Sequence, residues 1–215
     1  MGPPNPPRTA HFVDSVTQKV NAALAKSSST STLVVKVRHT ITRSDTVIHE
    51  LKYQFQNPGL VAQQAKLATF IGKPLPEFAL PDLAGKMVRA KSLRGQPAVL
   101  NLWFTACAPC IGEMPALNKI QAEKASASVA FLALTYDNRA KVRAFLPKHP
   151  FTFRHLPNAQ AYCAQFISSY PISIFVDRTG IIRRIEGGMW QSNEKGEGHA
   201  DEGDFRYALE EVKTP

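Results

Sequence analysis

The sequence lacks a long apolar run, and this absence excludes the simplest membrane-spanning architecture. A helix that crosses a bilayer needs about 18 or more apolar residues, whereas the longest apolar stretch here, Pro97–Phe104, is interrupted by Asn101. The first residues, Met1–Arg8, hold four prolines and no apolar segment. We therefore expect a flexible leader there and no secretory signal within this sequence. The hydrophobic fraction of 44% and the charged fraction of 20% are sufficient for a packed core.

Concentrated positive charge is also missing, although the chain is basic. Lys and Arg outnumber Asp and Glu by 26 − 17 = 9, yet nowhere do four basic residues stand together. The spacings typical of zinc fingers, basic zippers and RNA-binding strands are absent. We therefore expect a solvated basic surface and no nucleic-acid partner.

Cysteine is scarce, with only three in 215 residues. A disulfide framework normally needs an even and larger number, and a structural zinc site normally needs two C-x-x-C pairs. Only Cys107 and Cys110 form such a pair, so that Cys163 with His149 or His155 would have to complete a zinc site. The sequence predicts no metal and no organic cofactor.

The first third of the chain predicts a small α+β extension, residues 1–71. Apolar residues at helical spacing predict a helix over Phe12–Ala25, and two alternating stretches, Leu33–Ile41 and Thr46–Phe55, predict a β-hairpin. A short helix is expected over Val61–Phe70. No catalytic constellation is found in this part, and its function stays open, with a protein-interaction module as one possibility.

A shift in composition at Gly72–Pro76 predicts a domain boundary, and strands and helices alternate from there to the end of the chain. This order predicts an α/β domain over residues 72–215, a mixed sheet covered by helices. The expected strands are Val88–Ala90, Pro97–Phe104, Val129–Tyr136, Phe151–His155, Ile172–Val176 and Ile181–Glu186. The expected helices are Pro109–Lys124, a segment from Asp137 or Asn138 toward Lys148, Asn158–Ile167 and Phe205–Val212.

The cysteine pair Cys107-Ala108-Pro109-Cys110 stands where a buried strand gives way to a helix. The free N–H groups and the dipole at a helix start favour a negative charge, and they therefore favour a thiolate at Cys107. Cys110 follows within one turn, close enough to form a disulfide with Cys107. We expect Cys107 to be exposed and to attack a substrate disulfide, and Cys110, more buried, to resolve the mixed disulfide. A purely structural local disulfide is the alternative.

Five ordered segments give this part of the chain a family resemblance. They are Asn101–Cys110, Gly72–Leu80, Leu93–Pro97, the helix positions Glu113 and Pro115, and Tyr170–Asp177 followed by Gly180. Over about residues 72–190 the chain resembles the TlpA/ResA-like extracytoplasmic thiol-disulfide oxidoreductases of the thioredoxin-fold redoxin superfamily. The resemblance implies a thioredoxin-like mixed sheet and dithiol–disulfide exchange with protein cysteines.

The resemblance also implies residue roles. Pro171 would be a cis-proline facing the cysteine pair, and Tyr170 would offer backbone groups to a bound peptide. Glu113 would assist proton transfer during resolution, or would be a solvated helix carboxylate. Cys163 is expected to be a small buried residue rather than a third redox thiol. The implied catalytic residues are Cys107, Cys110 and Glu113, and the implied substrate-binding residues are Tyr170, Pro171, Ala108 and Pro109.

One departure from the family pattern concerns Ala106, which stands where many relatives have Trp directly before the first cysteine. It predicts a less aromatic contact surface. Asn101 occupies a position where thioredoxin has a buried acid, so that any proton relay there would be altered.

The resemblance implies a bacterial cell-envelope location. The residues themselves leave the redox direction open, because oxidation of a substrate dithiol would use the same two sulfurs. The resemblance implies a reductase, in which electrons flow from an upstream donor to protein disulfides. A membrane tether or signal would lie outside this sequence. Two alternative functions would use the same cysteine pair. A peroxiredoxin-like peroxidase normally has Thr or Ser three residues before its reactive cysteine, whereas Thr105 is two before Cys107. A Cu(I) metallochaperone would use the same two sulfurs.

Overall fold

The computed structural model describes residues 7–26, 31–43, 46–56, 58–123, 129–166, 169–192 and 198–213. The chain divides into two compact units, Met1–Ala65 and Lys66–Pro215. The functional division at residues 71/72 stays a prediction. Across the described residues, no helix is both long and apolar enough to cross a membrane.

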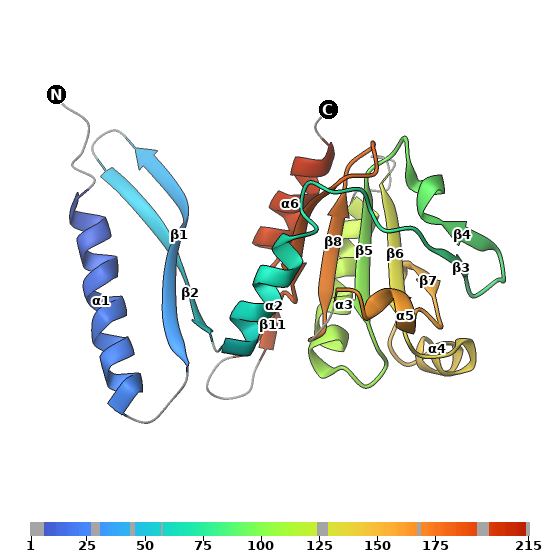
Figure 1. The fold of residues 1–215 in the computed structure, drawn as a ribbon, viewed down its shortest axis with the longest axis horizontal. Coiled ribbons are helices and arrows are strands. Elements are labelled where there is room, and N and C mark those ends of the chain that lie inside the picture. The colour runs from blue at the N-terminus through green and yellow to red at the C-terminus, as the bar shows by residue number, and fades with distance from the viewer. Residues whose placement is uncertain are drawn as a thin grey trace. The chain divides into compact units, whose positions relative to one another are not determined.

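The described residues of the first unit form a helix, a β-hairpin and the greater part of a second helix (Figure 1). Helix α1 spans Pro7–Lys26, and the antiparallel strands β1 and β2 span Thr32–Arg43 and Thr46–Gln56. The Asn21 side chain ties the helix to the first strand, because its amide oxygen accepts from the Leu33 N–H at 2.5 Å and its amide nitrogen donates to the Leu33 carbonyl at 3.1 Å. Helix α2, Pro58–Ala68, follows the hairpin.

The second unit is built on a five-stranded mixed sheet with the order β7-β6-β5-β8-β9. Strands β5, β6 and β7 are parallel, and β8 and β9 complete the sheet in antiparallel pairings. This arrangement confirms the predicted thioredoxin-like mixed sheet. The strand bounds are Ala98–Trp103 (β5), Ala130–Thr135 (β6), Arg154–Leu156 (β7), Ile172–Val176 (β8) and Ile182–Gly187 (β9).

Alternation along β5 sends its side chains into two separate cores. Leu100 and Leu102 pack in one cluster with Phe166, whereas Val99 and Trp103 pack in the other with Leu117. The second cluster lies under helices α3 and α6, and the first contains residues of α5 together with Leu75 and Phe78. The helices span Ala108–Glu123 (α3), Arg139–Phe145 (α4), Gln160–Cys163 (α5) and Gly203–Lys213 (α6).

Local signals fix several of the connections. Asn138 caps α4, since its side chain accepts from the Lys141 N–H, and Gly180 turns the β8–β9 hairpin at a φ of +87°. Two short antiparallel strand pairs complete the described structure: β3 (Ala79–Pro81) pairs with β4 (Met87–Arg89), and β10 (Trp190–Ser192) pairs with β11 (Gly198–Ala200). Of these four strands, the sequence predicts only β4. A short 3₁₀ helix, η1, spans Ala90–Leu93.

Helix α5 covers only the middle of the predicted helix over Asn158–Ile167, and residue 167 lies outside the described residues, as does Lys124 at the predicted end of α3.

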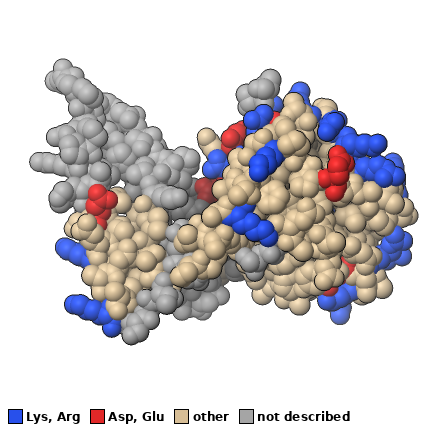
Figure 2. Space-filling view, viewed as in Figure 1, with Lys and Arg blue, Asp and Glu red and all other residues tan. Residues whose placement is uncertain are grey.

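Basic side chains are distributed over the visible face of the second unit, with acidic side chains between several of them (Figure 2).

Candidate active site

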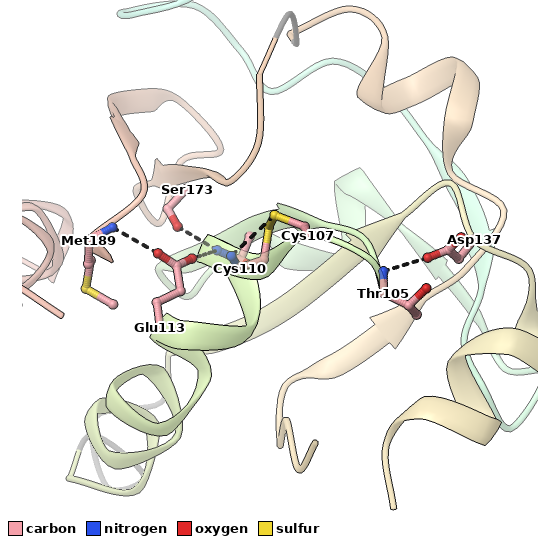
Figure 3. The surroundings of a disulfide bond; sticks show 8 residues. Thr105, Cys107, Cys110, Glu113, Asp137, Ser173 and Met189 are labelled. Carbon is pink, nitrogen blue, oxygen red and sulfur yellow. Dashed lines mark hydrogen bonds between the residues drawn. A yellow bond between two sulfur atoms is a disulfide. The ribbon is translucent and has the colours of Figure 1, made fainter. Parts of the chain in front are cut away.

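The two cysteines meet where β5 gives way to α3, and they form a disulfide (Figure 3). Their sulfurs are 1.99 Å apart, and the Cys110 N–H points at Cys107 Sγ at 3.3 Å. Cys107 directly precedes Ala108, the first residue of α3, so that its sulfur lies among the unpaired N–H groups of a helix start. Pro109 fits the first helical turn because it has no N–H that needs a partner. A helix start of this kind favours a negative charge.

The predicted exposure of Cys107 is wrong for this disulfide form. Its side chain is 4% exposed and that of Cys110 is 1% exposed, because both sulfurs pack into the apolar cluster under α3. The predicted order, with Cys110 the more buried, is the one observed. Ala106, Ala108 and Pro109 are exposed around the pair, and we call these three residues the rim.

Glu113 lies one turn after Cys110 on α3 and is 2% exposed, so it is not a solvated helix carboxylate. It accepts hydrogen bonds from Asn101 Nδ2 at 3.1 Å and from the Met189 N–H at 2.9 Å (Figure 3). Burial raises the pKa of Glu113 to about 7, even though both hydrogen bonds act to lower it. Its carboxyl group therefore changes protonation state near neutral pH.

The support for Glu113 comes from two paired strands. Asn101 on β5 and Ser173 on β8 are register partners, and both fall on the α3 face of the sheet. Asn101 Nδ2 also donates to Ser173 Oγ at 3.0 Å, which holds the amide beneath the carboxylate. The sequence analysis did not identify Ser173. The alternation of Ile172, Ser173 and Ile174 could have indicated it, because in a strand the Ser173 side chain lies on the opposite face of the sheet from its two neighbours.

The Tyr170–Pro171 peptide is cis, as the resemblance implied. Pro171 contacts the backbone at Gly188, where an added Cβ would lie 2.6 Å from Pro171 Cγ and 3.4 Å from Glu113 Oε2. Cis-Pro171, Gly188 and the Glu113 carboxylate are therefore immediate neighbours. Gly188 and Met189 were missed by the sequence analysis because no local motif marks them.

A second polar contact holds the turn before the disulfide. Asp137, two residues after β6, accepts from the Thr105 N–H at 2.7 Å (Figure 3). It also accepts from Lys141 Nζ at 2.6 Å. Although burial acts to raise it, these hydrogen bonds and the Lys141 charge hold the pKa of Asp137 below its usual value. The backbone between β5 and Cys107 is thereby fixed to the neighbouring strand.

Cys163 is buried and not part of the disulfide. Burial raises the pKa of its thiol to about 12, so that it stays a neutral thiol at physiological pH. His155, considered as a zinc ligand, is buried beside Trp103 and Phe151, and its Nε2 lies 2.8 Å from the Phe151 carbonyl. Within the described ranges, no three His, Cys, Asp or Glu side chains are grouped so that they could hold a metal ion.

Comparisons with known proteins agree with this geometry. The AhpC/TSA family model matches residues 71–185, which include the disulfide, Glu113 and Pro171. The chain belongs to the AhpC/TSA family. This AhpC/TSA protein is 33% identical over 128 residues to thioredoxin-like protein YneN of Bacillus subtilis, covering 57% of this chain and 75% of that protein. It is 32% identical over 148 residues to the thiol-disulfide oxidoreductase ResA of Bacillus cereus, covering 66% of this chain and 82% of ResA.

A solved structure shows the same fold. The thiol:disulfide interchange protein of the thioredoxin family from Chlorobium tepidum superposes with a TM-score of 0.54 at 19% identity, covering 66% of this chain and 96% of that one. Together with the Cys107–Cys110 disulfide, the matches identify this AhpC/TSA protein as a thiol-disulfide oxidoreductase with a thioredoxin-like fold.

Proposed function

We propose that the protein reduces disulfides of other proteins and that Cys107, Cys110 and Glu113 carry the reaction. The observation that supports this most directly is a redox-active pair at a helix start with a buried carboxyl group, of pKa about 7, one turn away. A group with a pKa close to the working pH is suited to move protons in both directions.

The proposed reaction has two steps. The Cys107 thiolate attacks one sulfur of the substrate disulfide, which forms a mixed disulfide and releases the first substrate thiolate. Glu113 then accepts the Cys110 thiol proton, and the Cys110 thiolate attacks Cys107 Sγ. The Cys107–Cys110 disulfide forms, the second substrate thiolate leaves and takes up a proton, and two electrons have passed to the substrate. An upstream dithiol donor returns the pair to its reduced form.

Substrate binding is assigned to the rim and to the cis-proline. Exposed Ala108 and Pro109 lie beside the sulfurs, and the backbone at Tyr170 and Pro171 would pair with an extended peptide. Support for this comes from the contact of Pro171 with Gly188, which places the cis-proline beside Glu113 and hence on the side of the sheet that carries the disulfide.

The test is turnover of a disulfide-linked fluorescent peptide by the wild type and by three cysteine variants. We expect Cys107→Ser to lose all turnover and Cys110→Ser to accumulate a one-to-one mixed disulfide with the peptide. Cys163→Ser is the matched control and should keep the wild-type rate, because its thiol is buried and neutral. Turnover by Cys107→Ser, or failure of Cys110→Ser to trap peptide, would contradict the proposal.

We further propose a bacterial cell-envelope location, where a reductant of this kind acts on proteins in an oxidising compartment. The support is the family resemblance and the similarity to ResA. Fractionation of cells that express the native gene tests this: the protein should separate with the envelope fraction, and recovery with cytosolic markers would contradict it.

A further inference from the structure

Three aromatic rings meet at the edge of the sheet that carries the disulfide. Phe104 and Tyr136 directly follow the parallel strands β5 and β6, and Tyr170 shortly precedes the antiparallel strand β8. Their ring centroids are 5.2 Å apart for Phe104–Tyr136, 5.2 Å for Phe104–Tyr170 and 5.9 Å for Tyr136–Tyr170. All three residues therefore contact one another, and we call them the aromatic cluster.

The aromatic cluster is joined to the reactive pair. The Phe104 carbonyl accepts a hydrogen bond from the Cys107 N–H at 3.1 Å, and Phe104 and Tyr170 pack against the apolar cluster that contains both cysteines. Tyr170 is also the residue before cis-Pro171, and it is partly buried against both apolar clusters of the second unit. Two of the rings are therefore fixed in place, and neither needs to be ordered when another chain arrives.

Tyr136 is the exposed member of the aromatic cluster, at 39% exposure. The charges next to it are already paired, since Asp137 is bound by Lys141 and by the Thr105 N–H. The exposed residues on the cysteine side, Ala106 and Ala108, are short and apolar. The surface beside the disulfide is thus aromatic and uncharged, although the sequence predicts a less aromatic one from Ala106. The rings come from three strand ends instead of from the residue before the first cysteine.

We propose that the aromatic cluster binds a large apolar or aromatic side chain of the target polypeptide, close in sequence to its reacting cysteine, and so sets substrate preference. This inference rests on the proposed function, because that reaction brings a polypeptide to Cys107. Fixed aromatic rings give binding surface at low cost in conformational entropy, and their pairs with other aromatic rings are favourable. An acidic or basic peptide would find no unpaired charge among the residues of this surface.

The test uses a set of disulfide-linked peptides that place one Phe at each position from three before to three after the cysteine, with an all-Ser peptide as reference. The measured quantity is the ratio of kcat/KM for the best Phe peptide to that for the Ser peptide. We expect a ratio of about 10 in the wild type, expressed mainly in KM, as for truncation of one well-packed aromatic contact.

Substitution then assigns the preference to the cluster. Tyr136→Ala should bring the ratio close to 1, whereas Tyr136→Phe keeps the ring and should keep the ratio. Tyr207→Ala is the control. Tyr207 lies on α6, is 56% exposed, and packs under Arg184 of β9 rather than in the aromatic cluster. Its ratio should equal that of the wild type.

Two results would overturn the inference: a wild-type ratio near 1 at every Phe position, or a ratio that persists in Tyr136→Ala. A ratio that changes with protein concentration would show that a second copy of the chain covers the cluster, which also overturns it. Failure of the wild type to turn over any of the peptides would instead contradict the proposed function, so the two failures are distinguishable.

Discussion

Glu113 is the residue at which the energetics of folding and of the reaction conflict. Burying a carboxylate costs free energy unless hydrogen bonds replace the lost water, and Glu113 receives two such bonds, from Asn101 and from the Met189 N–H. They offset burial only in part, since the pKa is still raised to about 7. The protein thus holds beside its disulfide a group that exchanges its proton at neutral pH.

The first prediction concerns the resolution step. If Glu113 accepts the Cys110 proton, the release rate should rise with pH through about 7 and then level off, because only the ionised carboxylate is a base. Glu113→Gln should slow release by about 100-fold or more, within the usual range for general-base catalysis, and should lose the inflection. The measurement is single-turnover release of peptide from a preformed Cys107 mixed disulfide between pH 5 and 9.

The control for this experiment is Glu123→Gln, on the last turn of the same helix. Glu123 is paired with Arg206 at the surface and should leave the rate within twofold of the wild type. An inflection near pH 7 that survives in Glu113→Gln would show that another group moves the proton.

At the scale of elements, the β9–β10 connection must approach cis-Pro171 closely to bring the Met189 N–H to Glu113. Only a residue without a Cβ allows this approach at position 188, since a Cβ there would lie 2.6 Å and 2.9 Å from two ring atoms of Pro171. Gly188 is therefore a positioning residue that acts through the Met189–Glu113 hydrogen bond.

The second prediction follows from that contact. Gly188→Ala should push the connection away, weaken the bond from Met189 and raise the pKa of Glu113 further, so that the inflection in the release rate moves to higher pH. Gly187→Ala is the matched control, since a Cβ at Gly187 would meet nothing within 4 Å. An unshifted inflection in Gly188→Ala, with the protein folded, would show that the close approach does not govern Glu113.

Elements of high local regularity were predictable from the sequence. Strand β5 is apolar at nearly every position because both of its faces are buried, and the hairpin at Asp177–Gly180 carries its own turn signals. The disulfide position followed from the same logic, as a C-x-x-C directly after that strand. The short strands β10 and β11 were not predicted from the sequence.

The surroundings of the disulfide were less predictable, because they join residues that are distant in sequence. The Met189–Glu113 bond spans 76 residues and depends on cis-Pro171 and Gly188 together. The burial of Cys107 likewise depends on the packing of α3 and α6 against the sheet. A local pattern predicts the position of the disulfide, whereas the burial of its cysteines and the pKa of Glu113 depend on tertiary contacts.

At the scale of the whole molecule, three buried titratable groups influence stability in different pH ranges. Although burial acts to raise it, hydrogen bonds from Thr179, Ile181 and Arg183 lower the pKa of Asp177 to about 2. Its contribution to stability is therefore present above the unfolded pKa of 3.8 and is lost as the pH falls toward 2. Burial lowers the pKa of His155 below its unfolded value of 6.5. The unfolded chain therefore binds more protons below pH 6.5, and the folded protein becomes less stable as the pH falls.

Glu113 acts in the opposite direction. Its folded pKa of about 7 exceeds the unfolded value of 4.5, so the folded protein binds more protons between these values and becomes less stable as the pH rises through them. The third prediction is that Glu113→Gln unfolds at higher urea concentration than the wild type at pH 8. The difference should reach at most about 3 kcal/mol, at 1.36 kcal/mol for each pKa unit.

At pH 4.5 the same difference should be much smaller, because the wild-type carboxyl group is then almost wholly neutral in the folded protein and only half ionised in the unfolded chain. The amide can replace it in the site, since flipping Asn101 and rotating the Ser173 hydroxyl restore donors and acceptors to match. Asp177 and His155 are unchanged between the two proteins, so their contributions cancel in the difference. Urea unfolding of the oxidised proteins at both pH values is the measurement, with Glu123→Gln expected to stay within about 0.5 kcal/mol of the wild type. An equal difference at pH 4.5 and pH 8 would show that packing, rather than the buried charge, separates the two proteins.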